Sequence, residues 1–368
     1  MMDTHDLFAA TVAHYLAPVK QYLDDPAVSE IMINHAHEIY IERDGRLEQT
    51  DAHFHDDEAY TAAVNNVLQY SGKSLADQDP LIDARLPDGS RVHVAKEPCA
   101  RLGTVTTIRK FNRMMLDIEW LIELGTLTES AAEYLKIAVR SERNLLVVGG
   151  TSSGKTSLLN ALSAFIPTGE RIVVIEDSAE LQLQQNHVIA LESRRADRHG
   201  RGQVAIRELF RSSLRLRPDR IIIGEVRGGE ALDMIQAMTS GHGGSMGTLH
   251  ADNPVDAMSR LETLALMSKV ELPLHALRAQ IASALDVIVQ LSRQIGGRRL
   301  VTQITEILPL SDDGQYRLRD LFTLTPTGDD DGKSLQLTEA GASSTMAGHL
   351  QPETKALVTD ATHKIFAL

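Results

Sequence analysis

The feature that most constrains this chain is the stretch VVGGTSSGKTSLLNALSAF at residues 147–165. It contains the pattern G-x-x-x-x-G-K-[ST], with the strand-like NLLVV before it and the helix-like SLLNALSAF after it. Such a loop surrounds a phosphate with backbone N–H groups, and its lysine reaches the β- and γ-phosphate oxygens. We therefore predict a nucleotide site formed by Gly149, Gly150, Thr151, Ser152, Ser153, Gly154, Lys155, Thr156 and Ser157.

Two further apolar strands end in carboxylates. RPDRIIIGEVRGGEALD predicts a buried strand followed by Glu225, and RIVVIEDSAEL predicts another that ends at Glu176 and Asp177. Because the carboxyl ends of parallel strands meet at one edge of a sheet, we expect these side chains beside the phosphate loop. There Thr156 would bind Mg²⁺ directly and Glu225 through water, and a carboxylate would polarise the attacking water. The residues alone leave open whether Glu225 or Glu176 is that general base.

Histidines and arginines complete the predicted site. TSGHGGSMGTLHADNP places His242 and His250 on either side of a strand-like segment, and an imidazole can donate a hydrogen bond to a γ-phosphate and report its presence. An arginine from the preceding domain can stabilise charge on the γ-phosphoryl group if the domains close on a nucleotide. We expect His250, Arg91 and Arg109 to act in catalysis with the loop lysine and the two glutamates. Phosphate sensing is expected of His242, His250 and Arg85.

The sequence pattern changes along the chain and predicts its domains. Residues 1–110 are expected to form a mixed α+β domain, which includes a hairpin in LIDARLPDGSRVHVA, and residues 111–127 a linker. Over residues 128–310, helical patterns alternate with short apolar strands, which predicts a mostly parallel sheet with helices on both faces. Residues 311–368 are expected to be a C-terminal appendage with one strand.

Composition limits the classes of function and location. The chain has 37 basic and 50 acidic side chains and a net charge of -13, the wrong sign for a protein whose main task is to neutralise phosphate backbones. The single cysteine, Cys99, cannot form an internal disulfide, and we expect it to be buried. Neither a signal peptide nor a membrane span is recognisable. The sequence therefore predicts a cytoplasmic chain that reaches a membrane only through a partner.

Four segments in a fixed order resemble one protein family. GGTSSGKT, VVIEDSAEL, LRLRPDRIIIGEVRGGEALDMIQAMTSGH and GTLHADNP resemble the bacterial secretion and pilus traffic ATPases, most of all the Flp/Tad pilus (CpaF-like) ATPases and their conjugation and type IV secretion relatives. The resemblance implies a RecA-like P-loop ATPase domain preceded by a smaller mixed α+β, PAS-like domain. It assigns Glu176 to the acidic box and Glu225 to the Walker B position. It also assigns His242 and His250 to the histidine box, and Arg91 and Arg109 to the first-domain contacts with phosphate.

The resemblance also implies a function. It predicts a homo-hexameric motor that hydrolyses ATP with Mg²⁺ and powers pilus assembly or protein secretion. The motor would sit at the cytoplasmic face of the inner membrane, through a platform protein of the pilus or secretion machine. Extension motors of this superfamily often contain a four-cysteine zinc module, and a chain with one cysteine does not fit that branch. Two alternatives stay open: a conjugation or type IV secretion ATPase or nucleic-acid translocase, and an ATP-gated scaffold with little turnover.

Overall fold

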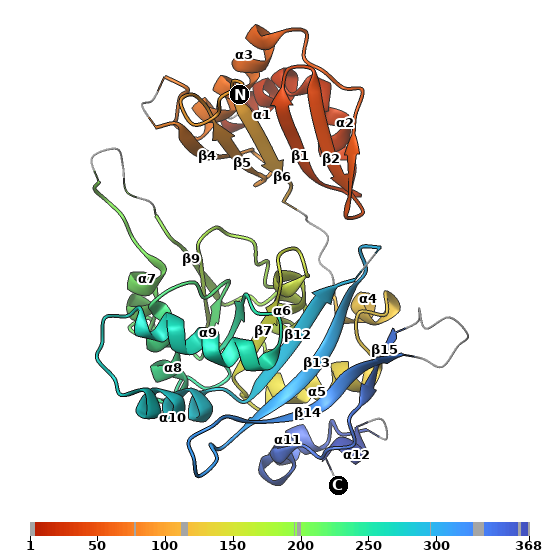
Figure 1. Ribbon diagram of the computed structural model, residues 1–368, viewed down its shortest axis with the longest axis vertical. Helices are drawn as coiled ribbons and strands as arrows, with labels where there is room; N and C mark the ends of the chain where they lie inside the picture. Colours follow the sequence, from red (N-terminus) through yellow and green to blue (C-terminus); the bar gives the residue numbers. More distant parts are fainter. Residues whose placement is uncertain are drawn as a thin grey trace. The chain divides into compact units, whose positions relative to one another are not determined.

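The computed structural model describes residues 4–76, 79–111, 117–194, 196, 200–294, 296–326, 335–359 and 362–366. The chain divides into two compact units, Met1–Met114 and Met115–Leu368 (Figure 1). Each unit has its own hydrophobic core. The predicted linker lies partly outside the described residues. Among the described helices, none combines the length and the apolar character that a bilayer crossing requires.

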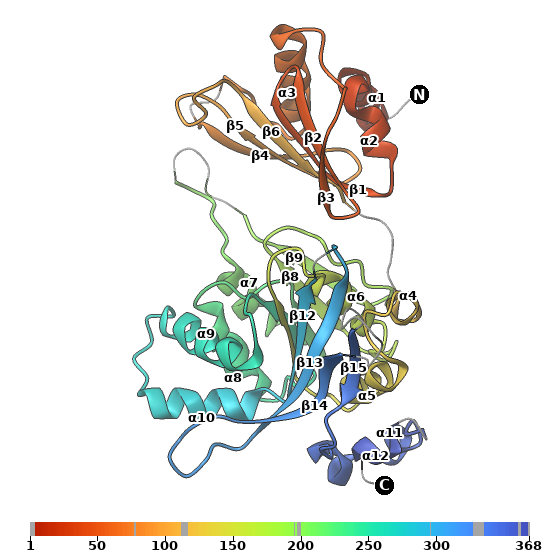
Figure 2. The ribbon, with the colours of Figure 1, turned by 45° about the vertical axis from the view of Figure 1, so that its right-hand side comes forward.

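The first unit is an antiparallel sheet with helices packed on one face (Figure 2). Its strand order is β3-β2-β1-β6-β5-β4. The core forms where alternate strand residues, such as Ile31 and Ile33, meet the apolar sides of α1 and α3. The elements are α1 (Thr4–Tyr15), η1 (Ala17–Val19), α2 (Lys20–Asp24), β1 (Val28–His35), β2 (Glu38–Arg43), β3 (Arg46–Gln49), α3 (Asp57–Tyr70), β4 (Leu81–Arg85), β5 (Arg91–Ala95) and β6 (Val105–Arg109).

The structure confirms the predicted hairpin in this unit and contradicts the predicted burial of Cys99. The hairpin predicted around PDG is present as β4 and β5, and Gly89 at its turn has a φ of +94°. The prediction that Cys99 is buried is wrong, since this side chain is exposed. Cys99 lies in a surface turn closed by a hydrogen bond of 3.0 Å from its N–H to the carbonyl of Lys96, so its side chain faces solvent rather than the core.

The second unit contains a nine-stranded sheet in the order β15-β14-β13-β12-β7-β11-β10-β8-β9. The strands from β12 to β9 in this order are parallel to one another, as predicted from the alternation of strands and helices. The elements are α4 (Ile118–Glu123), α5 (Glu129–Arg140), β7 (Leu145–Gly149), α6 (Lys155–Ser163), β8 (Ile172–Glu176), β9 (Val188–Glu192), α7 (Ile206–Ser213), β10 (Arg220–Ile223), α8 (Glu230–Met238), β11 (Met246–Leu249), α9 (Pro254–Leu266), α10 (Leu274–Ala284), β12 (Val287–Arg293), β13 (Arg299–Leu308), β14 (Arg317–Pro326), β15 (Leu335–Glu339), η2 (Thr345–His349), α11 (Pro352–Lys355) and α12 (His363–Phe366).

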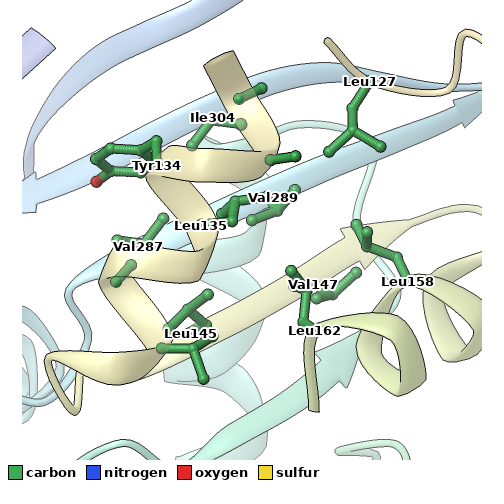
Figure 3. Packing of buried hydrophobic residues seen from close by; sticks show 14 of the residues in the cluster. Leu127, Tyr134, Leu135, Leu145, Val147, Leu158, Leu162, Val287, Val289 and Ile304 are labelled. Atoms are coloured by element: carbon green, nitrogen blue, oxygen red, sulfur yellow. The ribbon is translucent and has the colours of Figure 1, made fainter. Parts of the chain in front are cut away.

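Helices cover both faces of this sheet. On one face, Leu135 of α5 and Leu162 of α6 belong to the same buried cluster as Val147 and Val289 of the central strands (Figure 3). Helices α7 to α10 cover the other face, where Val148 and its neighbours in the strands point. The central strands are therefore buried on both sides, which explains why their sequences are apolar without alternation. A sheet fixed in this way holds its carboxyl edge rigid.

The last part of the chain extends the large sheet. Strands β14 and β15 pair antiparallel beyond β13, and the sequence had indicated only one of these two strands. The buried carboxylate of Glu306 in β13 accepts hydrogen bonds from Tyr134 of α5 at 3.0 Å and from the N–H and hydroxyl of Thr345, each at 2.9 Å. These bonds tie the segment around Thr345 to the centre of the unit.

Candidate active site

The phosphate loop connects β7 to α6, as the sequence predicts. A side chain at Gly149 would place its Cβ 2.4 Å from the carbonyl oxygen of Leu291 and 2.6 Å from Oγ of Ser153, so only glycine fits there. Gly154 has a φ of +96° and stands immediately before the first residue of α6. The loop is thus held against β12 with the N-terminus of α6 at its centre, which is the arrangement that binds phosphate.

Lys155 lies inside this loop. The residue is 8% exposed, and Nζ donates hydrogen bonds to the carbonyl oxygens of Gly149 and Gly150 at 3.0 and 2.7 Å. Burial lowers the pKa of Lys155, and the carboxylate of Glu225 opposes that change. The ammonium group of Lys155 is therefore hydrogen-bonded to the loop carbonyls and interacts electrostatically with the carboxylate of Glu225.

Glu225 follows β10 and contacts two side chains, an imidazole and a guanidinium. Its Oε1 lies 3.2 Å from Nε2 of His250, and its Oε2 accepts a hydrogen bond of 2.6 Å from Nη2 of Arg227. His250 directly follows β11, so two neighbouring strand ends bring the pair together. Burial and the positive charge of Lys155 lower the pKa of His250, which keeps the imidazole neutral to lower pH than usual. Arg227 is not among the site residues predicted from the sequence.

Glu176 has a different environment from Glu225. It is 4% exposed, and its Oε1 accepts hydrogen bonds from the backbone N–H groups of Glu180 and Leu181 at 2.9 and 3.0 Å. A Cβ at Gly224 would lie 2.9 Å from Cγ of Glu176. The glycine after β10 therefore leaves the space that the side chain of Glu176 occupies. The carboxylate fixes the segment that follows β8.

Asp177 lies next to Glu176 and belongs to the same polar edge. Its Oδ1 accepts a hydrogen bond of 2.6 Å from Ser193, and its Oδ2 lies 3.7 Å from Nη1 of Arg227. Arg227 thus connects the ends of β8 and β10. The carboxylates predicted to converge at the carboxyl edge of the sheet do so.

The two predicted histidines lie at opposite ends of one strand. His250 follows β11, whereas His242 lies in the turn before it. Since β11 runs parallel to β7, which leads into the phosphate loop, His242 is at the edge of the sheet away from that loop. Among the described residues, Nδ1 of His242 is buried without a hydrogen-bond partner. The structure brings His250, but not His242, to the site within this chain.

The three predicted arginines form a row in the first unit. Arg85 pairs with Arg91 across β4 and β5, and Arg91 pairs with Arg109 across β5 and β6. Directly paired residues of antiparallel strands project from the same face, and here their neighbours Ile108 and Val92 are buried on the other face. The arginines therefore share the face away from the helices, where Arg109 forms an ion pair with Glu30. Their contact with a nucleotide stays a prediction.

The donor set of the second unit fits Mg²⁺. Thr156 lies in the first turn of α6 with its side chain half-buried, and Glu225 offers a carboxylate from the end of β10. Mg²⁺ at phosphate sites uses one or two protein oxygens and completes its shell with phosphate oxygens and water. In the described part of the chain, no cluster of three or more histidine, cysteine, aspartate or glutamate side chains offers a complete metal site. Thr156 and Glu225 are thus the oxygen donors that suit this ion.

Comparison with known proteins gives consistent matches. The family described as type II/IV secretion system protein matches residues 13–308. A putative conjugal transfer protein of Mycobacterium tuberculosis is 32% identical over 288 residues, which are 77% of this chain and 81% of that protein. The type IV secretion system protein PtlH of Bordetella pertussis is 34% identical over 325 residues, covering 80% of this chain and 95% of PtlH.

Among solved structures, the pilus retraction motor PilT with bound ADP aligns with a TM-score of 0.59 and 19% identity. The alignment covers 81% of this chain and 84% of PilT. This similarity confirms the fold class predicted from the sequence, a RecA-like domain preceded by a smaller domain of strands and helices. The family matches likewise confirm the resemblance that the four sequence segments indicated.

Proposed function

Because this chain belongs to the type II/IV secretion system protein family, we propose that it is a hexameric motor that hydrolyses Mg-ATP. It would power pilus assembly or protein secretion at the cytoplasmic face of the inner membrane, docked on a platform protein of that machine. The observation that supports this most is the convergence of Lys155, Glu225 and His250 beside one phosphate loop. ATP hydrolysis uses a cation beside the phosphates and a residue that positions the attacking water, and Lys155 and Glu225 would supply these two groups.

Binding of the nucleotide is assigned to the loop and its lysine. The N–H groups of the loop and of the first turn of α6 would hold the β-phosphate. Lys155 would exchange its hydrogen bonds with the carbonyls of Gly149 and Gly150 for phosphate oxygens. Thr156 and, through water, Glu225 would hold Mg²⁺, which supplies charge neutralisation to the phosphates when bound.

The role of general base falls to Glu225 rather than Glu176. Glu176 is committed to two backbone N–H groups and is almost completely buried. Glu225 is 21% exposed, and its carboxylate oxygens contact side chains, those of Arg227 and His250, instead of backbone N–H groups. Glu225 would polarise the attacking water, and His250 would donate a hydrogen bond to the γ-phosphate and so report its presence.

Arginines of the first unit would complete the site when the units close on ATP. Arg91 and Arg109 share one face of the sheet, and a guanidinium can neutralise the γ-phosphoryl charge in a bidentate manner. Arg85, next in the same row, would sense the phosphate. Closure on ATP and opening after hydrolysis would transmit work to the membrane partner.

Light scattering of the purified chain tests the proposed assembly. With Mg²⁺ and a non-hydrolysable ATP analogue we expect a mass six times the 40.4 kDa of one chain. A monomer that persists at all nucleotide concentrations and releases no phosphate from ATP would contradict the ring motor and favour an ATP-gated scaffold.

The relative named as a conjugal transfer protein favours a second candidate, a motor for nucleic-acid transfer. The net charge of -13 opposes direct contact with DNA. Phosphate release measured with and without duplex or single-stranded DNA separates the two candidates. Stimulation by DNA that weakens as salt rises would favour the nucleic-acid motor, and its absence the pilus or secretion motor.

A further inference from the structure

The hairpin of β12 and β13 ends against the phosphate loop. The carbonyl oxygen of Leu291 in β12 occupies the space that a side chain at Gly149 would need. On β13, Cδ of Arg299 lies 3.3 Å from the position of a Cβ at Gly154. Nε of Arg299 donates a hydrogen bond of 3.0 Å to the carbonyl oxygen of Ser152. Arg299, which is exposed and distant from the loop in the sequence, is thus hydrogen-bonded to the loop.

Ser152 has an unusual backbone conformation. Its φ is +56°, in the left-handed region that residues with a Cβ avoid. Such a conformation persists when surrounding contacts hold it, and it is concentrated at functional sites. The hydrogen bond from Arg299 is a contact of this kind, because it fixes the direction of the carbonyl that follows the unfavourable φ.

We infer that Arg299 is a positioning residue that holds the phosphate loop in its nucleotide-binding conformation. Ser152 lies in the middle of the loop whose N–H groups would surround the phosphate, so its conformation sets the directions of those groups. Arg299 restrains it from outside and leaves Lys155 to contact the phosphate. A preformed loop need not be ordered on binding, which raises affinity. This inference rests on the proposed function, because it requires that ATP binds this loop.

Binding of methylanthraniloyl-ATP with Mg²⁺ to the full chain tests the inference. We expect Arg299→Ala to raise the Kd about tenfold, the effect of losing one charge-assisted hydrogen bond. Arg299→Lys should lose almost as much, because lysine keeps the charge but not the geometry of Nε. The matched control is Arg298→Ala, since the guanidinium of this neighbouring exposed arginine lies beside Gly125 instead of the loop. Its Kd should stay within about twofold of wild type.

The substitution Ser152→Gly distinguishes a positioning role of Arg299 from direct contact between Arg299 and the phosphates. Gly adopts a positive φ without steric cost, so the restraint from Arg299 matters less in the Ser152→Gly background. There we expect Arg299→Ala to change the Kd by about twofold or less. In steady-state hydrolysis, Arg299→Ala should raise KM and leave kcat unchanged, because ground state and transition state use the same loop. Each variant is also checked by thermal unfolding.

These measurements distinguish a failure of the inference about Arg299 from a failure of the proposed function. Unchanged affinity of Arg299→Ala, beside a wild type that binds, would overturn the inference alone. A tenfold loss that persists in the Ser152→Gly background, or a fall in kcat, would replace positioning by direct contact with the phosphates. Full binding by Arg299→Lys would show that charge suffices and would also overturn it. A wild type that does not bind the probe would overturn the proposed function and the inference together.

Discussion

Oε1 of Glu225 lies 3.2 Å from Nε2 of His250, although a helix and a strand separate the two residues in the chain. The contact arises because β10 and β11 are parallel neighbours whose carboxyl ends meet at the phosphate loop. It couples the residue proposed to polarise water to the residue proposed to read the γ-phosphate.

Glu225→Gln should separate binding from turnover. Glutamine keeps the size of the side chain but cannot accept a proton, so we expect ATP binding within about threefold of wild type. Hydrolysis should fall by about 100-fold or more, the range for loss of a general base. Equilibrium binding and phosphate release on the same preparation check both numbers. Undiminished turnover would remove Glu225 from the mechanism.

Glu176→Ala should affect stability first. The substitution leaves the N–H groups of Glu180 and Leu181 without their acceptor in a partly buried place. We expect a loss of about 1–3 kcal/mol in the free energy of unfolding, measured by urea denaturation. Glu176→Gln retains an acceptor oxygen and should lose less. If Glu176→Gln instead abolishes hydrolysis at unchanged stability, the general base is Glu176 and not Glu225.

His250 should make stability depend on pH. Burial and Lys155 lower its pKa in the folded chain below the usual 6.5, while Glu225 opposes that change. The unfolded chain therefore binds the proton more readily, and stability should fall as the pH drops below about 6.5. His250→Gln should reduce this fall, measured as Tm against pH, whereas substitution of the exposed His275 should not. Identical profiles for wild type and His250→Gln would contradict the assignment.

Gly244→Ala should be severely destabilising, and Gly241→Ala is its control. Both glycines have a positive φ, but a Cβ at Gly244 would lie 1.7 Å from Nη1 of Arg220, and one at Gly241 would meet nothing within 4 Å. Arg220 is buried and forms an ion pair with Glu170. We expect losses of about 3 kcal/mol or more for Gly244→Ala and about 1–2 kcal/mol for Gly241→Ala, by denaturant unfolding. Equal losses would contradict the steric explanation.

Local sequence signals predict the strands and the phosphate loop well. Continuous apolar runs such as LLVV mark strands covered on both faces, and the glycines at positions 149 and 154 occur where the backbone allows no other residue. The carboxyl edge of a parallel sheet then places Glu225 and His250 correctly without any knowledge of distances. The strands and the loop depend on residues that are adjacent in the chain, and the placement of Glu225 and His250 follows from the general rule for parallel sheets.

Features that depend on distant pairing are not predictable in this way. His242 and His250 are both expected to sense the phosphate, yet the predicted strand between them, β11, separates them across the sheet. The bond from Arg299 to Ser152 exists because β12 and β13 pair beside β7, an order that no local pattern encodes. Glu176 is committed to backbone N–H groups, which only the folded segment after β8 reveals.

Phosphate release from Mg-ATP by the purified full chain, compared with Lys155→Ala, tests the central proposal most directly. Lys155 is the buried ammonium group of the loop, so its removal should abolish phosphate stabilisation while the fold remains, as thermal unfolding can verify. We predict Mg²⁺-dependent release by the wild type and a loss of about 100-fold or more in Lys155→Ala. No release by the wild type, or equal release by both proteins, would contradict an ATP-hydrolysing motor at this loop.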